Sequence, residues 1–228
     1  MKNRFSRIAS AIATATAKPF LLLTAAVLLF ACTFVSCGGK TITCGWDESA
    51  EPTDYVCLTV RYVNSDKETV TGDIVIKLRG DVAPITVENF KELVASDFYN
   101  NLTFHRVYSG FMMQGGDPKG NGTGGSEHNI KGEFSSNGVE NTLSHKRGVV
   151  SMARSNDPDS ASSQFFICHA DSTFLDGNYA AFGEVVFGME TVDGIAGTEV
   201  VSNGSELSKP VTAPVIVKAY FVIAPDGI

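Results

Sequence analysis

The chain is poor in the residues that metal centres and nucleic-acid surfaces need. It has four histidines in 228 residues, and no pair of them (His105, His128, His145, His169) has the spacing of a zinc site. Its 18 basic residues face 25 acidic ones without forming a basic patch, so a phosphate backbone would be repelled. The composition therefore predicts no nucleic-acid partner, no metal and no cofactor.

The sequence also lacks an apolar run long enough to cross a bilayer. The N-terminal run from Phe20 to Val35 is shorter than the roughly 20 residues that a spanning helix needs. Four basic residues precede its start, and the first acidic residue is Asp47. A basic segment, a short apolar core and small residues near a cleavage point are typical of a secretory signal. The pattern predicts that the protein is exported.

The end of this run resembles the lipobox of a bacterial lipoprotein. Residues 34–39 read Phe-Val-Ser-Cys-Gly-Gly, and Cys37 would take the lipid and become the mature N-terminus. Cys32 is the alternative site, and an ordinary secretory signal is the alternative reading. We favour Cys37 because the apolar core continues to Val35 and glycines follow. The protein would then be lipid-anchored to a membrane, on the periplasmic side or at the cell surface.

This interpretation divides the chain into three segments. Residues 1–36 are expected to be a signal peptide, 37–54 a lipidated tether without apolar periodicity, and 55–228 one folded domain. Cleavage would remove four basic residues and leave 14 against 25 acidic ones, a net charge of about −11.

Three further cysteines remain after the signal. An oxidising compartment would allow a disulfide between Cys44 and Cys57, and the alternative is that all three thiols are free. Cys168 lies in an apolar segment and is typical of a buried free thiol.

The domain is dense in strand signals. Short alternating or apolar segments predict strands at 56–63, 70–78, 103–107, 112–115, 148–153, 164–168, 181–186 and 211–223. A helix is expected after Pro84, with Thr86 as its cap and Glu88 in its first turn, and a shorter helix at 189–195. Many short strands favour a closed barrel, which has no free edges, although the pattern does not separate barrel from sandwich.

Two segments combine a cation, amides and large apolar side chains. The first reads Phe-His-Arg-Val at 104–107 and Phe-Met-Met-Gln-Gly-Gly-Asp at 111–117; the second reads Ser-Gln-Phe-Phe-Ile-Cys at 163–168. Because strand side chains alternate, Met112 and Gln114 share one face, as do Gln164 and Phe166. Neither segment offers a nucleophile or a metal-ligand set. This inventory suits binding and twisting a substrate better than cleaving it.

Both segments resemble those of the cyclophilin-type peptidyl-prolyl cis/trans isomerases, in their bacterial branch, and the resemblance covers essentially all of 55–228. It implies a mainly β fold, a closed eight-stranded antiparallel barrel capped by two helices. The implied activity is non-covalent acceleration of rotation about Xaa-Pro bonds in exported polypeptides. The implied partners are proline-containing unfolded or flexible chains. The alternative function is a chaperone or scaffold that binds proline segments with little catalysis.

The resemblance also implies residue roles. Catalysis falls to Arg106 and Gln114. The remaining matched positions would surround the substrate: Phe111, Met112, Ala153, Arg154, Gln164, Phe166, Phe174, Leu175 and Tyr179. Phe174 stands where many eukaryotic members have Trp, and the missing indole N–H predicts weak cyclosporin binding.

The glycine-rich segment 115–125 does not indicate a nucleotide site. It lacks the Gly-Lys-Ser/Thr ending of a phosphate loop, and no amphipathic helix follows it. The resemblance places it beside the substrate groove.

Overall fold

A computed structural model describes residues 39–225. The expected signal peptide, with Cys32 and Cys37, lies outside the described residues. Within 39–225, no helix is both long enough and apolar enough to cross a membrane.

The described chain is mainly β, with two α-helices, α1 (Pro84–Ala95) and α2 (Met189–Ala196), and two short 3-10 helices, η1 (Ser135–Asn137) and η2 (Thr173–Leu175). The strands are β1 (Lys40–Ile42), β2 (Tyr55–Val63), β3 (Thr69–Leu78), β4 (Arg106–Tyr108), β5 (Met112–Gly115), β6 (Val149–Met152), β7 (Phe165–Cys168), β8 (Ala181–Phe187), β9 (Val200–Ser202), β10 (Leu207–Pro210) and β11 (Val215–Phe221).

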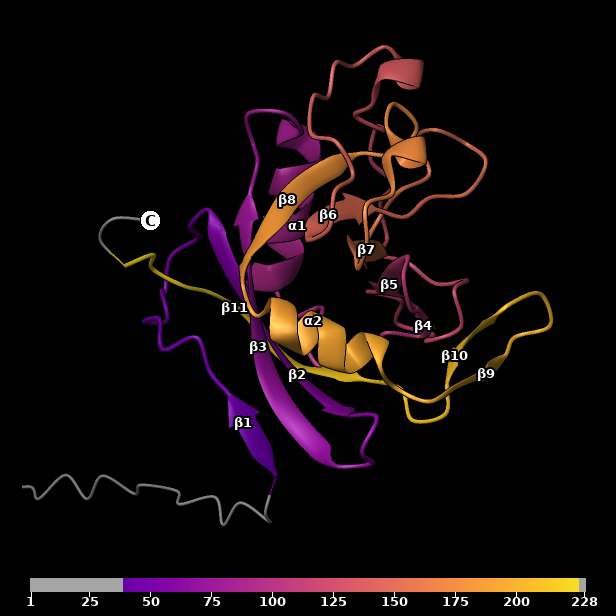
Figure 1. The fold of residues 1–228 in the computed structure, drawn as a ribbon. Coiled ribbons are helices and arrows are strands. Elements are labelled where there is room, and N and C mark those ends of the chain that lie inside the picture. Colours follow the sequence, from indigo (N-terminus) through magenta and orange to yellow (C-terminus); the bar gives the residue numbers. More distant parts are fainter. Residues whose placement is uncertain (1–38, 226–228) are drawn as a thin grey trace, which may run out of the picture. The chain divides into compact units, whose positions relative to one another are not determined.

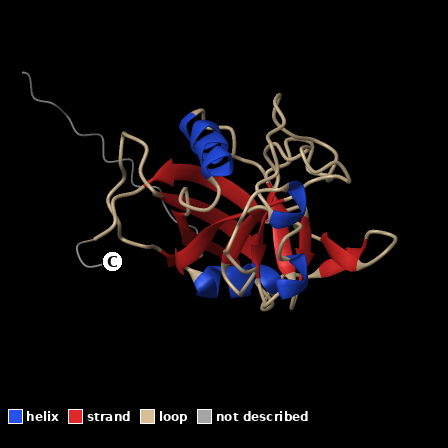
Figure 2. Cartoon of the chain, turned by 90° about the horizontal axis from the view of Figure 1, so that it is seen from above, coloured by secondary structure: helices blue, strands red, loops and turns tan. Residues whose placement is uncertain are grey.

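One large sheet organises the fold (Figure 1). Its nine strands include the antiparallel path β11-β2-β3-β8-β6-β7-β5-β4, and β1 is added parallel to β3. Figure 2 shows helices on opposite sides of the strands, where α1 contacts β11 and α2 contacts β2 and β3.

The prediction of a closed barrel was wrong, because the end strands β4 and β11 do not pair with each other. The irregular segment before β4 lies between them. Phe104 donates its N–H to the carbonyl of Pro214 at 2.9 Å, and Ile216 donates to Leu102 at 2.8 Å. Thr103 makes only single bridges to Val215 and to Asp117. The sheet is therefore an open half-barrel.

The prediction that residues 37–54 form a tether was also wrong for 39–54, the part that the structure describes. Residues 40–42 form β1, which pairs with residues 70–72 of β3. Glu48 bridges to Val222, and Ser49 donates its N–H to the carbonyl of Phe221 at 2.9 Å. We call residues 39–54 the N-terminal strap, since they follow the surface of the sheet rather than leave it.

A second unpredicted element is the hairpin formed by β9 and β10, which projects beside β4 at the right of Figure 1. Its base is anchored, since β10 contacts β4 and Ser208 is fully buried. Leu207 and Val201 are exposed, so the hairpin shows little of the alternation that identifies a strand in a sequence.

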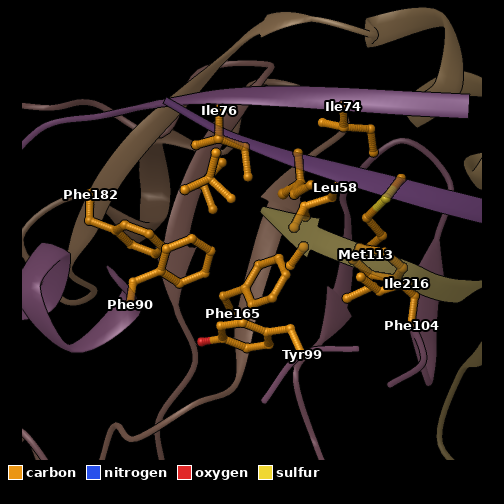
Figure 3. Packing of buried hydrophobic residues seen from close by; sticks show 14 of the residues in the cluster. Leu58, Ile74, Ile76, Phe90, Tyr99, Phe104, Met113, Phe165, Phe182 and Ile216 are labelled. Atoms are coloured by element: carbon orange, nitrogen blue, oxygen red, sulfur yellow. The ribbon is translucent and has the colours of Figure 1, made fainter. Parts of the chain in front are cut away.

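The core lies between the sheet and α1 and is rich in aromatic side chains (Figure 3). The ring of Phe90 on α1 lies 5.0 Å from those of Tyr99 and Phe182 and 5.6 Å from that of Phe165, measured between centroids. The Tyr99 hydroxyl donates to the carbonyl of Ser163 at 3.0 Å, so its burial leaves no unpaired donor.

Helix α1 is capped by a residue that is distant in sequence, and not by Thr86 as predicted. Its N-cap residue is Ala83, which has no side-chain cap, and its first turn has no acidic residue. The buried carboxylate of Glu133 instead accepts the N–H groups of Ile85 and Thr86, at 3.1 and 2.8 Å, and the Thr86 hydroxyl at 2.7 Å. A negative charge at this end of a helix is favourable.

Candidate active site

Four strands bring a row of side chains to one face of the sheet. Arg106 on β4 lies opposite Gln114 on β5. Gln114 lies opposite Phe166 on β7, which in turn lies opposite Ser151 on β6. The residues that alternate with them belong to the main core. The row therefore faces away from that core, as alternation predicts.

The guanidinium of Arg106 is held by an acidic side chain from the β9–β10 hairpin. Its Nε donates to Oε1 of Glu206, and its Nη2 donates to Oε2 at 2.9 Å. Its third nitrogen, Nη1, lies 3.5 Å from Oε1 of Gln114. The hydrogen bonds from Arg106 lower the pKa of Glu206 to about 2, against a smaller opposing effect of burial. The carboxylate of Glu206 is therefore ionised at any ordinary pH.

A chain of amides extends from this pair. Gln114 donates from Nε2 to Oε1 of Gln164 at 2.8 Å, and Gln164 donates from Nε2 to the carbonyl of Gly124 at 2.7 Å. Each amide is thus oriented by its neighbour, and the row is tied to the glycine-rich segment.

A pocket of about 160 Å³ opens beside the row. Its apolar wall consists of Phe111, Met112, Phe166 and Leu175, which form a small cluster separate from the main core. Arg106 stands at the edge of the pocket, with its guanidinium carbon 5.9 Å from the Phe111 ring centroid. A small apolar pocket with one cation at its edge suits a single ring whose neighbouring atoms accept hydrogen bonds.

A longer polar groove of about 440 Å³ continues from the pocket. The two share Gln114, Ala153 and Arg154 in their linings. Residues 122–126 and Gln164 also line the groove. Together, the pocket and the groove fit an extended chain that carries one apolar ring.

Of the remaining predicted residues, Phe174 lies at the rim of the pocket, whereas Tyr179 and Arg154 belong to its lining. Phe174 is 71% exposed and does not line the pocket, but its ring lies 5.5 Å from that of Phe111, which does, measured between centroids. Tyr179 does line the pocket, edge-on to Phe166. The guanidinium of Arg154 lies 4.8 Å from the Tyr179 ring centroid.

His145 supports the pocket from behind. Its ring stacks on Phe166, with centroids 6.0 Å apart. Nδ1 lies 2.7 Å from Oδ1 of Asp176, and Nε2 lies 3.0 Å from Oγ of Ser151. Burial lowers the pKa of His145, and the nearby Asp176 offsets this only in part. The imidazole is therefore neutral near pH 7, with Nδ1–H donating to the carboxylate.

Asp117 organises the glycine-rich segment. Its buried carboxylate accepts the N–H groups of Lys119, Asn121 and Gly122 at 2.8, 3.0 and 2.6 Å. Burial by itself would raise the pKa of Asp117, but these backbone hydrogen bonds together outweigh it and lower the pKa. The donors that would cradle a phosphate are thus occupied by a carboxylate.

Comparison with known proteins places this geometry in a family. Residues 63–220 match the family model of the cyclophilin type peptidyl-prolyl cis-trans isomerases. The chain belongs to this family.

The cyclophilin has close bacterial relatives. It is 40% identical over 154 residues to the peptidyl-prolyl cis-trans isomerase of Acinetobacter baylyi, an alignment that covers 64% of this chain and 78% of the relative. It is 38% identical over 164 residues to peptidyl-prolyl cis-trans isomerase A of Dickeya dadantii, covering 68% and 82% of the two chains. Peptidyl-prolyl cis/trans isomerisation is the activity of this cyclophilin, and the prediction is confirmed.

Solved structures agree with the fold. A cyclophilin type isomerase of Cryptosporidium parvum superposes with a TM-score of 0.63 at 30% identity, covering 75% of this chain and 99% of the other. A second structure of that protein, with a TM-score of 0.59, was determined in the presence of the dipeptide Ala-Pro.

Most of the predicted site residues of the cyclophilin thus lie along one pocket and groove, and Phe174 lies at the rim. Three residues that shape the site were not predicted from the sequence: Glu206, His145 and Asp117. The first lies 100 positions from its partner Arg106, and nothing in the intervening sequence indicates the contact. Asp117 carried a signal, because a carboxylate inside a glycine-rich turn commonly accepts backbone N–H groups.

Proposed function

We propose that this cyclophilin isomerises Xaa-Pro bonds in exported polypeptides, with Arg106 and Gln114 as its catalytic residues. The observation that carries the proposal is the row in which a charged guanidinium, an oriented amide and an apolar pocket lie side by side. No covalent step is needed, because the reaction is a rotation.

The rotation is slow because amide resonance sets a barrier of about 18–20 kcal/mol. Twisting the bond removes the resonance and localises a lone pair on the prolyl nitrogen. Nη1 of Arg106, which Glu206 does not use, donates to that nitrogen and so stabilises the twisted amide more than either planar form. Gln114 orients the guanidinium and contacts the substrate backbone.

The proline ring occupies the apolar pocket of Phe111, Met112, Phe166 and Leu175. The pocket holds the ring while the segment before it turns. A structure of the Cryptosporidium parvum protein was determined in the presence of the dipeptide Ala-Pro, which supports a proline-containing ligand for a fold of this kind.

Residues before the proline lie in the polar groove, against Ala153, Arg154 and Gln164. The Ala153 N–H is already bonded to the carbonyl of Gln164 at 2.9 Å, so the other backbone groups of this segment are the ones that pair with substrate. Phe174 and Tyr179 limit the groove at the side of the residues after the proline.

The location follows from the N-terminal sequence. Cleavage before Cys37 and lipidation of its thiol anchor the protein to a membrane, on the periplasmic side or at the cell surface, where exported chains emerge unfolded. With a net charge of about −11, the mature surface would contribute little attraction to an anionic lipid surface, so the lipid is the main attachment.

The test is cis/trans exchange of an Ala-Pro-Phe peptide by the full chain. Arg106→Ala is expected to lower kcat/KM about 100-fold, roughly 3 kcal/mol of transition-state stabilisation, with an unchanged circular dichroism spectrum. Arg61→Ala, an exposed arginine on β2, is the matched control and should leave the rate unchanged.

Two outcomes would count against this mechanism. Full activity in Arg106→Ala would remove the arginine from the reaction. No acceleration by the folded wild-type protein would favour the second reading of the same pocket, a chaperone or scaffold that binds proline segments without catalysis.

A further inference from the structure

A second cluster of reactive side chains lies away from the pocket. Sγ of Cys44, Sγ of Cys57 and a carboxylate oxygen of Asp73 all lie within 4.8 Å of one another. Cys57 on β2 and Asp73 on β3 are buried, and Cys44 belongs to the N-terminal strap and is half-buried. Both cysteines precede residues 63–220, so the two thiols lie outside the part of the chain that the family model matches, whereas Asp73 lies inside it.

Asp73 holds the strap in place over Cys57. Its Oδ2 accepts the backbone N–H of Cys44 at 3.0 Å, and its Oδ1 accepts the hydroxyl of Thr59 at 2.7 Å. The carboxylate therefore fixes the position of one thiol through its backbone while it lies beside the other.

The two thiols differ in accessibility. Cys57 is fully buried, and desolvation raises the pKa of its thiol far above the usual range. Cys44 is partly exposed, and its sulfur accepts the N–H of Trp46 at 3.4 Å. An incoming disulfide can reach Cys44 first.

We propose that Cys44 and Cys57 are an oxidisable pair that fastens the N-terminal strap to the sheet. The Cys44 thiolate attacks a protein or small-molecule disulfide and forms a mixed disulfide, and one thiol leaves. Cys57 then gives up its proton, and its sulfur displaces the second thiol from Cys44. Two hydrogens leave the protein, and the oxidising disulfide is reduced to two thiols.

The test uses the full chain incubated with oxidised glutathione. Cys44 and Cys57 lie in one tryptic peptide, residues 41–61, so closure appears as that peptide lighter by two hydrogens and resistant to alkylation. Cys57→Ser should retain a glutathione adduct on Cys44, whereas Cys44→Ser should leave Cys57 unmodified. Cys168→Ser, on β7, is the control and should close normally.

Closure should also raise the midpoint of thermal unfolding by about 5–10 °C over the reduced protein, since it cross-links a short loop. Two results would overturn the proposal. One is that both thiols stay open to alkylation after oxidation. The other is that Zn²⁺ protects both thiols and a chelator exposes them again, which would make the cluster a cation site.

A separate observation concerns Arg106 and rests on the proposed function of that residue. The turn that carries Glu206 is itself fixed, since Asn203 Oδ1 accepts the Glu206 N–H at 3.0 Å and the Ser208 hydroxyl donates to Glu206 Oε1 at 2.6 Å. The carboxylate engages one edge of the guanidinium through two hydrogen bonds and leaves Nη1 towards the pocket. We infer that Glu206 is a positioning residue, which keeps the plane of Arg106 aligned for catalysis.

Glu206→Ala is expected to lower kcat about tenfold with little change in KM. Glu206→Gln should retain part of the activity because the amide keeps one acceptor. In an Arg106→Ala background, Glu206→Ala should have no further effect, which a merely structural role would not predict. Glu199→Gln, an exposed carboxylate before β9, is the control.

Whether kcat rises or falls in Glu206→Ala decides whether Glu206 restrains Arg106 or positions it. A higher kcat in Glu206→Ala would mean that the ion pair restrains Arg106 from the substrate, and would overturn the inference. Unchanged activity in Glu206→Ala, with activity lost in Arg106→Ala, would refute the positioning role alone and leave the proposed function intact.

Discussion

Phe174 lies at the rim of the pocket, where a substitution should disturb the fold little. It is largely exposed, and its ring packs against that of Phe111 in the pocket wall. Phe174→Trp adds an indole N–H donor at a site where the wild type has none. We expect wild-type binding of cyclosporin to be weak and the variant to bind about tenfold more tightly, the free energy of one hydrogen bond.

Calorimetric titration of both proteins with cyclosporin measures this difference. Nanomolar affinity of the wild type would contradict the prediction, because the missing donor would then have no consequence. Equal weak affinities would show that the indole N–H is not the deciding group.

His145 makes stability depend on pH. In the unfolded chain its pKa is about 6.5, and in the folded protein burial holds its pKa lower. As pH falls through 6.5, the unfolded state gains a proton that the folded state does not, so the folded state loses relative stability. The unfolding midpoint should therefore fall by a few degrees between pH 7.5 and pH 5.5.

His145→Gln should flatten this slope, whereas His128→Gln, at an exposed position, should preserve it. Part of the slope should persist in the first variant, since burial also lowers the pKa of His105. The measurement is thermal unfolding followed by circular dichroism at the two pH values. A slope unchanged in His145→Gln would contradict the assignment.

At the scale of elements, helix α1 depends on the carboxylate of Glu133. Glu133→Ala leaves two N–H groups of the helix and the Thr86 hydroxyl without their acceptor in a buried place. We expect the free energy of unfolding to fall by about 2 kcal/mol. Urea denaturation measures it, with Glu140→Ala, an exposed acid in the same loop, as the control. Equal midpoints for the two variants would contradict the capping role.

The elements that bury one face against the core were predictable from the sequence. The elements at the periphery of the sheet were not. β2 and β3 have long alternating runs, and Val87, Phe90 and Val94 recur at helical spacing, so their burial leaves a pattern. β1 has three residues and pairs along one side only. The β9–β10 hairpin is held by its base and exposes Leu207, so no periodic signal marks it.

The site divides in the same way. Alternation predicted that Met112 and Gln114 share one face of their strand and that Gln164 and Phe166 share one face of theirs, because every second side chain of a strand points to the same face. It could not place Arg106 opposite Gln114, since register depends on which strands meet. The resemblance to a family supplied that neighbourhood. Neither strand alternation nor the family resemblance predicted a role for Glu206, because only the folded β9–β10 hairpin brings it to Arg106.

At the scale of the whole molecule, the proposed membrane anchor depends on one thiol. Cys37→Ser should move the protein from the membrane fraction to the soluble fraction and remove the lipid mass from the intact protein, since the proposal places the anchor on that single residue. Cys32→Ser should leave both unchanged. The reverse result would assign the anchor to Cys32, and no lipid in the wild type would indicate an ordinary secretory signal.

The row of Arg106, Gln114, Phe166 and Ser151 has a consequence for how such an enzyme can diverge. Every member is fixed by the pairing of β4, β5, β7 and β6, and a slip of one residue would turn the row into the core. The groove beside it is lined largely by loops, which tolerate substitution. If the row accelerates the reaction as proposed, most of the groove can change with client preference while the row, which shares only Gln114 with the groove lining, stays unchanged.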